Sequence, residues 1–213
     1  MLSLRLKTLA SFVDKMDRVV DVGCDHAYLS IYLIENRLCQ SVIATDIHEN
    51  ALLQAKKNIR KVQMEAKIKT ILSDGLEKVS FTLYDTILIA GMGTSTILHI
   101  LKNIDSKHVK KIILQSNNDL YRLRSSMEKK RYYLEEEKVV FEKGHYYVVG
   151  LYLFKKKKLS YREKLFGKYN ADNKEYYQFL MQKMRFVYQS LPFKNIKEKI
   201  IFWLKMNLLK KYL

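Results

Sequence analysis

The sequence predicts an α/β fold, in which a mostly parallel sheet has helices on both faces and a helical appendage follows it. Three observations support this prediction. Short apolar runs alternate five times with helical stretches, two β-rich runs stand four residues apart after them, and the residues beyond 155 show helical periodicity alone.

Five apolar runs are suited to strands covered on both faces, as in a parallel sheet. They are Arg18–Gly23, Ser41–Asp46, Lys67–Leu72, Tyr84–Ala90 and Lys110–Gln115. The helical stretches that precede, separate and follow them are residues 2–16, 27–34, 49–62, 95–104 and 119–131. This alternation predicts a doubly wound sheet with right-handed crossovers.

Two further β-rich runs, Glu136–Phe141 and Tyr146–Phe154, are too close for a crossover helix between them. We therefore expect an antiparallel hairpin that closes the sheet. Five alternating units closed by a hairpin is the element order of Rossmann-like class I methyltransferases. Dinucleotide dehydrogenases normally lack that hairpin, which disfavours a nicotinamide-dependent oxidoreductase.

The run Lys155–Lys158 predicts a boundary between a domain of residues 1–155 and a basic helical domain of residues 156–213. Asp172 with Glu175 has the spacing of a capping box at the start of one helix, which Pro192 ends. A second helix is expected from Asn195 to about residue 212. The short loop between them favours an antiparallel, coiled-coil-like helical hairpin.

Positive charge is concentrated in this appendage. The chain carries a net charge of +17, and residues 155–213 hold 16 basic and 4 acidic residues, a net +12. Uniform compositional drift toward lysine would not concentrate charge in this way. The pattern indicates a polyanionic partner, most simply a nucleic acid, and a small-molecule enzyme would have little use for it.

The remaining composition indicates a cytoplasmic protein without a membrane anchor. Cys24 and Cys39 give neither a disulfide framework nor metal-ligand spacing, so we expect no metal. No run of about 18 uncharged apolar residues predicts a transmembrane helix, and the N-terminus lacks a signal-peptide core. We also expect a monomer.

Polar residues and glycines follow four of the strands, and the carboxyl ends of parallel strands are where such sheets bind ligands. The first strand ends in Asp21, Gly23, Asp25 and His26, and Asp46 lies 23 residues after Gly23. That offset is close to the one at which an acid binds a ribose diol. Gly23 could also serve only a tight turn, and Asp46 could only cap the helix that follows it.

The third and fourth strand ends carry Asp74-Gly75 and Gly91-Met92. Asp74 could contact an adenine edge or only form an Asx turn, and Gly91 allows close approach of the backbone to a ligand. The dinucleotide fingerprint is absent because Asp25 stands where it needs glycine. An acid there would repel a pyrophosphate, but it suits S-adenosylmethionine, which carries a sulfonium and an ammonium group.

Several motifs resemble those of the bacterial tRNA (adenine-N1) methyltransferases that act on position 22. They are residues 21–29 (DVGCDHAYL), 73–76 (SDGL), 89–93 (IAGMG) and 113–117 (ILQSN), with Leu4-Arg5-Leu6 and Gly144-His145-Tyr146-Tyr147. The resemblance covers residues 3–154, and the family also carries a C-terminal helical extension. The chain departs from the usual family pattern at Thr94, where a second glycine is usual, and at Ser116, where proline is usual.

The resemblance implies methyl transfer from S-adenosylmethionine to N1 of an adenine in the D-arm region of tRNA. We expect the cofactor to be held by Asp21, Gly23, Asp25, His26, Asp46, Ile47, Asp74, Gly75, Gly91 and Met92. Asp25 is the first candidate to accept a proton or orient the base, and His26 is the second. We assign the substrate side to Arg5, Gln115, Asn117 and Tyr146.

Two alternatives stay open at this point. The chain could methylate another RNA, or it could be a non-catalytic RNA-binding protein on a methyltransferase fold. The intact acids Asp21, Asp46 and Asp74, together with Gly23, argue against the second alternative.

Overall fold

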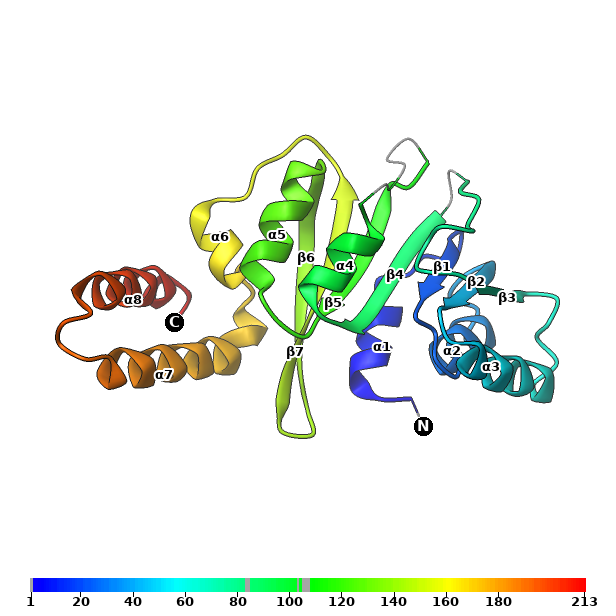
Figure 1. The fold of residues 1–213 in the computed structure, drawn as a ribbon, viewed down its shortest axis with the longest axis horizontal. Helices are drawn as coiled ribbons and strands as arrows, with labels where there is room; N and C mark the ends of the chain where they lie inside the picture. The colour runs from blue at the N-terminus through cyan, green and yellow to red at the C-terminus, as the bar shows by residue number, and fades with distance from the viewer. Residues whose placement is uncertain (1, 83–84, 103, 105–107) are drawn as a thin grey trace. The chain divides into compact units, whose positions relative to one another are not determined.

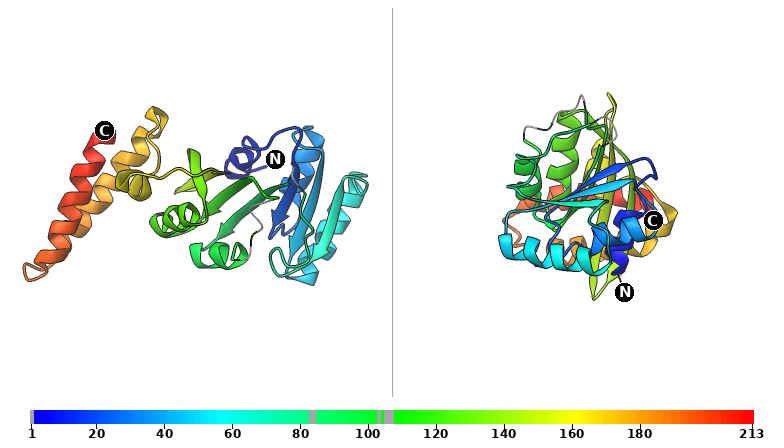
Figure 2. Two further views of the ribbon diagram at one scale, coloured as in Figure 1. Left: turned by 90° about the horizontal axis from the view of Figure 1, so that it is seen from above. Right: turned by 90° about the vertical axis from the view of Figure 1, so that its right-hand side faces the viewer.

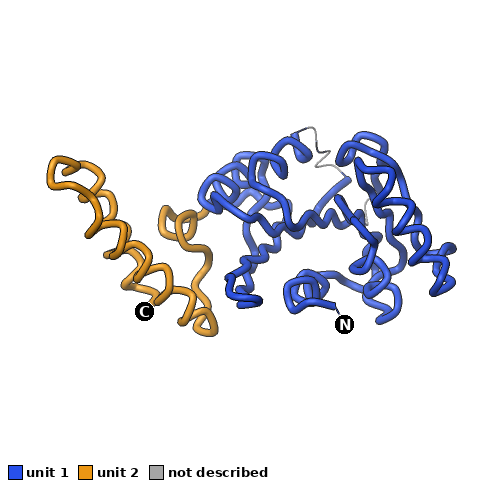
Figure 3. The backbone as a smooth tube through the Cα atoms, turned by 60° about the horizontal axis from the view of Figure 1, so that its bottom comes forward, with its two compact units in different colours: residues 1–158 blue, residues 159–213 orange. Residues whose placement is uncertain are grey.

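The structure is a computed structural model that describes residues 2–82, 85–102, 104 and 108–213. It consists of two compact units, Met1–Lys158 and Leu159–Leu213 (Figure 3). The division lies three residues after the boundary that the lysine run predicts. The two units are described separately below, as unit 1 and unit 2.

Unit 1 is built on a seven-stranded sheet with the order β3-β2-β1-β4-β5-β7-β6 (Figure 1). The strands are β1 (Arg18–Val22), β2 (Ser41–Asp46), β3 (Ile68–Leu72), β4 (Asp85–Met92), β5 (Lys111–Ser116), β6 (Tyr132–Glu142) and β7 (His145–Phe154). The first five pair in parallel, and β7 pairs antiparallel with both β5 and β6. The predicted doubly wound sheet with a closing hairpin is therefore confirmed.

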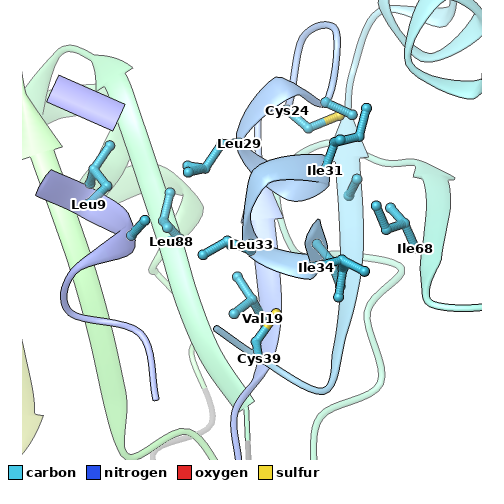
Figure 4. Close-up of a cluster of buried hydrophobic side chains, with 14 of the residues drawn as sticks. Leu9, Val19, Cys24, Leu29, Ile31, Leu33, Ile34, Cys39, Ile68 and Leu88 are labelled. Carbon is cyan, nitrogen blue, oxygen red and sulfur yellow. The ribbon is translucent and has the colours of Figure 1, made fainter. Parts of the chain in front are cut away.

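Helices cover both faces of this sheet. They are α1 (Leu4–Ala10), α2 (Tyr28–Glu35), α3 (Glu49–Lys61), α4 (Thr94–Ile100) and α5 (Leu120–Lys129). Helices α1, α2 and α3 share one buried cluster with alternate strand side chains such as Val19 and Leu88 (Figure 4). Helices α4 and α5 lie on the face opposite α1 (Figure 2). Because β1, β2, β4 and β5 pair in parallel, their carboxyl ends lie along one edge of the sheet.

The first helix is much shorter than the predicted range 2–16. Ser3 caps its start and the chain leaves the helix at Ser11. The apolar spacing continues beyond that point, but Asp14 and Asp17 both form ion pairs with Lys111 of β5. These ion pairs hold residues 11–17 in turns against the sheet.

The glycine-rich end of β4 is strand, whereas the sequence indicated a turn at residues 91–94. Gly91 and Met92 belong to β4, with a register shift between Ala90 and Met92 where the strand passes β5. The predicted first residue of this strand, Tyr84, lies outside the described residues. Helix α4 also ends earlier than predicted, at Ile100; Leu101 and Lys102 lie in a turn, and residue 103 of the predicted range lies outside the described residues.

Unit 2 contains three α-helices in its described residues: α6 (Tyr161–Phe166), α7 (Lys174–Ser190) and α8 (Ile196–Leu209). Helix α6 was not predicted. The capping box expected at Asp172 and Glu175 is wrong, because Asp172 lies in a 3-10 turn and α7 begins without a side-chain cap. The capping box of this unit belongs to α6, between Ser160 and Glu163.

Within the described ranges, every helix is too short or too polar to cross a membrane.

Candidate active site

The turn from β1 into α2 forms the centre of the candidate site. Gly23, Asp25 and Ala27 all have positive φ angles, of 72°, 52° and 58°. The amides of Gly23 and Cys24 donate to the carbonyl of Thr45 in β2, at 2.8 and 2.9 Å. The turn is therefore tied to the end of the neighbouring strand.

Asp46 connects the ends of β1 and β2 through its carboxylate. Its Oδ2 accepts from the Asp25 amide at 3.1 Å and its Oδ1 accepts from the His48 amide at 2.9 Å. His48 is the N-cap of α3, so Asp46 binds the capping residue rather than the amides of the first helical turn. Each carboxylate oxygen keeps acceptor capacity for a hydroxyl donor.

Asp21 lies below the turn and is buried. Its Oδ2 accepts from the Ser30 hydroxyl at 2.6 Å. Burial raises the pKa of Asp21 to about 6; the Ser30 hydrogen bond opposes this shift, and the charge of Asp46 adds to it. Three carboxyl groups thus surround Gly23, and a cation would relieve the cost of ionising the buried one.

Cys24 is not suited to act as a nucleophile. Burial raises the pKa of its thiol, and the charges of Asp21, Asp46 and Asp25 raise it further. The thiol therefore stays protonated at neutral pH, when only the thiolate attacks.

Asp25 and His26 lie side by side at the exposed mouth of the turn. The His26 Nε2 is 3.6 Å from Asp25 Oδ1, and the Asp25 side chain is 72% exposed. The other ring nitrogen, Nδ1, is buried and has no hydrogen-bond partner among the described residues. The His26 carbonyl accepts from Asn58 Nδ2 at 2.9 Å, which anchors this segment to α3.

A second cluster, at the ends of β4 and β5, centres on Gln115, which is fully buried. Its Oε1 accepts from the Gly91 amide at 3.0 Å and from Arg5 Nη1 at 3.1 Å. Its Nε2 donates to Asn117 Oδ1 at 3.0 Å, and Asn117 Nδ2 donates to the Gly91 carbonyl at 2.8 Å. Gln115 therefore orders Arg5, Asn117 and Gly91 instead of presenting its own amide.

Two residues that position Arg5, Tyr147 and Glu142, were not among the predicted site residues. The Arg5 guanidinium lies 5.2 Å from the centre of the Tyr147 ring. The predicted Tyr146 instead packs against Phe141, with ring centres 4.7 Å apart. The Glu142 carboxylate accepts from the Leu4 amide at 2.8 Å and the Arg5 amide at 3.4 Å, and these bonds, Leu4 first, lower the pKa of Glu142. Residues 137 or more positions apart make these bonds, so no local sequence signal could reveal them.

A cavity of about 130 Å³ collects the central residues: Arg5, Asp21, Gly23, Asp25 and His26 all line it. Asp74 instead lines a separate cavity of about 620 Å³ together with Leu76 and His99.

The remaining residues predicted to hold the cofactor, Ile47, Gly75, Gly91 and Met92, do not line the 130 Å³ cavity. Ile47 is largely exposed, and the Gly75 carbonyl accepts from the Thr45 hydroxyl at 3.2 Å. Gly91 and Met92 end β4, and the methyl group of Met92 fills the space that a Cβ on Gly23 would need. Glycine at position 23 thus satisfies both a left-handed backbone and a close contact.

Comparisons with known proteins agree with this architecture. A family described as a methyltransferase domain matches residues 2–149. The tRNA (adenine(22)-N(1))-methyltransferase of Bacillus subtilis (strain 168) is 36% identical over 150 residues, and the match spans 70% of this chain and 63% of the length of that relative.

Two solved structures extend the similarity to the whole chain. TrmK of M. capricolum, in complex with its cofactor product S-adenosyl-homocysteine, has a TM-score of 0.86 at 31% identity, with 100% of this chain and 97% of that chain covered. The B. subtilis M1A22 tRNA methyltransferase TrmK has a TM-score of 0.83 at 28% identity, with 100% and 98% covered. The acid-lined glycine turn, the closing hairpin and these matches together show that the chain belongs to the methyltransferase-domain family, in the TrmK group.

Proposed function

We propose that this protein transfers a methyl group from S-adenosylmethionine to N1 of adenine 22 in tRNA. The observation that carries the proposal is the convergence of Asp21, Asp25 and Asp46 on the Gly23 turn, beside a cavity that Arg5 also lines. The similarity to TrmK proteins specifies the nucleotide and its position.

The residues around the turn fit a cationic cofactor. Asp21 and Asp25 place negative charge where an ammonium and a sulfonium group would bind, and they would repel a pyrophosphate. The free acceptor capacity of Asp46 suits the ribose hydroxyls. Gly23, Gly91 and Met92 would pack against the cofactor, and His26, Ile47, Asp74 and Gly75 would complete its surroundings.

The bound cofactor would supply an electrophilic methyl group. The protein would contribute mainly position, because N1 of neutral adenine has an in-plane lone pair and needs no separate activation. Methyl transfer leaves the positive charge on the adenine ring, and a proton must leave the exocyclic amine if the neutral product is to form. Asp25, whose side chain is largely exposed, would accept that proton or orient the base. His26, 3.6 Å from that carboxylate, would orient it.

Recognition of the base would use the second cluster. N1 lies on the Watson–Crick edge, so a paired adenine must leave the stack first. Arg5, held by Gln115 and lying over Tyr147, would contact the phosphate or the extruded base. Asn117 and Tyr146 would line the same side. The lysine and arginine side chains within residues 155–213 would bind the tRNA backbone. We also propose that the enzyme acts as a cytoplasmic monomer.

The direct test incubates the protein with labelled S-adenosylmethionine and a tRNA transcript, and then maps the modified nucleoside. We expect 1-methyladenosine at position 22, and no label in the matched transcript that carries guanine there. Label at another nucleotide would refute the assigned position. Tight cofactor binding without any transfer would support the non-catalytic alternative.

The role of Asp25 is tested with Asp25→Asn. We expect kcat to fall by about 100-fold or more, since general acid–base groups contribute on that scale. Glu65→Gln is the matched control, because the one interaction of Glu65 within the described part of the chain is an exposed ion pair with Arg60 at 3.8 Å. An unchanged kcat for Asp25→Asn would exclude its proposed role.

A further inference from the structure

The end of the α7–α8 hairpin carries a hollow that the proposed reaction does not use. It has a volume of about 380 Å³ and is lined by six residues, one of them cationic and three aromatic. These residues are Tyr188, Phe193, Ile196, Lys199, Ile200 and Trp203.

The residues that line the hollow come from α8, from the end of α7 and from the loop between these two helices. Lys199 and Ile200 follow Ile196 by three and four positions and precede Trp203 by four and three, so all four residues share one face of α8. Tyr188, from the end of α7, and Phe193, from the loop before α8, lie across from that face.

Lys199 is built into the aromatic wall. Its ammonium lies 5.0 Å from the centre of the Tyr188 ring and 5.1 Å from that of Phe193. It also donates to the Tyr188 carbonyl at 3.4 Å. A positive charge is thereby held near two aromatic rings that line the hollow.

The large apolar side chains here are unusually exposed. Phe193 is 94% exposed, Ile196 63% and Trp203 53%. The surrounding charge is positive, since residues 183–205 contain six basic side chains and the single acid Glu198. The basic residues are Lys183, Arg185, Lys194, Lys197, Lys199 and Lys205. Aromatic rings interleaved with basic residues are the composition of surfaces that stack unpaired bases and hold the adjoining phosphates.

We propose that this hollow binds an unpaired nucleobase of the RNA substrate, stacked on Phe193 and Trp203, with Lys199 pairing with a neighbouring phosphate. The inference rests on the proposed function insofar as the substrate is RNA. It adds a base-stacking contact to an appendage whose charge alone predicts only attraction to a backbone.

The chain contains one tryptophan, so the emission of Trp203 reports on this hollow directly. We would titrate the full-length protein with a single-stranded oligoribonucleotide and, separately, with inorganic polyphosphate of the same total charge. Stacking predicts strong quenching by the oligonucleotide and little by polyphosphate. Equal quenching by the two, or none by either, would overturn the proposal.

Matched variants separate stacking from general attraction. Phe193→Ala should weaken binding of the oligonucleotide about tenfold, whereas Phe186→Ala, which removes a 71% exposed ring outside the hollow, should leave it unchanged. Lys199→Gln should weaken binding more than Lys197→Gln, which removes the same charge from the same helix. Equal effects within either pair would contradict the inference, and circular dichroism checks that each variant is folded.

Two other occupants of the hollow would give distinct results. Burial against a second copy of the chain would shift Trp203 emission to the blue as the protein concentration rises, and dimers would appear in ultracentrifugation. Insertion into a membrane would shift Trp203 emission to the blue, without quenching, when anionic vesicles are added. Either result, with no response to RNA, would overturn the proposal. These titrations need no cofactor, so they can fail while methyl transfer succeeds, and the reverse.

Discussion

The interior of unit 1 and the surface of unit 2 differ in the side chains that they contain. In unit 1 even charged and amide groups are buried in specific pairs, such as Arg124 with Glu137 and Gln115 with Gly91. In unit 2 large apolar groups remain exposed, and Leu209 is the one buried residue of α8. The two candidate sites differ in the same way: the cavity of unit 1 is lined by polar groups that have partners within the protein, whereas the hollow of unit 2 is lined largely by exposed apolar side chains.

The architecture explains this contrast. In a sheet covered by helices on both faces, the central strands are shielded from water. A polar group there must therefore find a partner within the protein. Two helices that pack along one line leave their remaining faces exposed to solvent. The following four predictions test this contrast, beginning with the largest expected effect.

The first concerns the buried ion pair of unit 1. Arg124 Nε lies 2.8 Å from Glu137 Oε1 and the side chains are 1% and 4% exposed. Glu137→Ala leaves a buried guanidinium without this partner and should lower the free energy of unfolding by about 3–5 kcal/mol in urea titrations. Glu135→Ala, which removes an exposed pair with Lys155, should cost about 1 kcal/mol or less. Similar losses would show that burial of the Arg124–Glu137 pair does not decide its contribution to stability.

The second concerns Asp21 and pH. Its pKa rises from 3.8 to about 6 on folding, so the folded protein binds the proton more tightly than the unfolded chain does. The contribution of Asp21 to stability is therefore full below pH 4 and is lost as the pH rises toward about 6. Asp21→Asn, which can still accept from Ser30, should raise the free energy of unfolding at pH 7.5 by up to about 3 kcal/mol.

At pH 4 the same variant should have the stability of the parent, since Asp21 is then protonated in the folded state. Calorimetry should also show weaker binding of S-adenosylmethionine by Asp21→Asn at pH 7.5. A stability gain that does not depend on pH would mean that ionisation of Asp21 is not its source.

The third concerns the one capping box of unit 2 that the structure describes. Ser160 Oγ accepts from the Glu163 amide at 3.2 Å, and Glu163 Oε2 accepts from the Ser160 amide at 2.7 Å. Ser160→Ala should destabilise α6 by about 1 kcal/mol, seen as faster amide exchange in that helix. Ser190→Ala removes only a bond to the Phe186 carbonyl within α7 and should have a smaller effect. The reverse order would show that the box does not hold α6.

The smallest effect is expected at Phe193. Because its ring is 94% exposed, Phe193→Ser should change the free energy of unfolding by no more than about 0.5 kcal/mol in thermal melts. A loss above 1 kcal/mol would place the ring in the core of unit 2 instead of on its surface.

The sequence predicted the sheet well because buried parallel strands appear as continuous apolar runs. It misplaced the end of β4, because two glycines around Met92 suggest a turn while the strand continues there through a register shift. It extended α1 too far, because local periodicity contains no information about the ion pairs of Asp14 and Asp17 with Lys111.

Some features of the candidate site could likewise be predicted from the sequence, and others could not. Topology alone brings the ends of β1 and β2 together, so the proximity of Asp21, Asp25 and Asp46 followed from their positions after strands. The supports of Arg5 did not follow, since Glu142 and Tyr147 meet it only through the packing of α1 against the hairpin. Contacts between segments so distant in sequence leave no periodic signal.

The left-handed residues of the β1–α2 turn have a consequence for ligand affinity. Asp25 and Ala27 lack the freedom of glycine, and each left-handed residue costs about 1–2 kcal/mol. The packing of the surrounding core stabilises this conformation when the protein folds, so the turn is preorganised. Binding of a ligand then does not include the free energy of ordering the turn. Ser30→Ala, which removes the hydrogen bond to Asp21, should therefore reduce cofactor affinity well before it unfolds the protein.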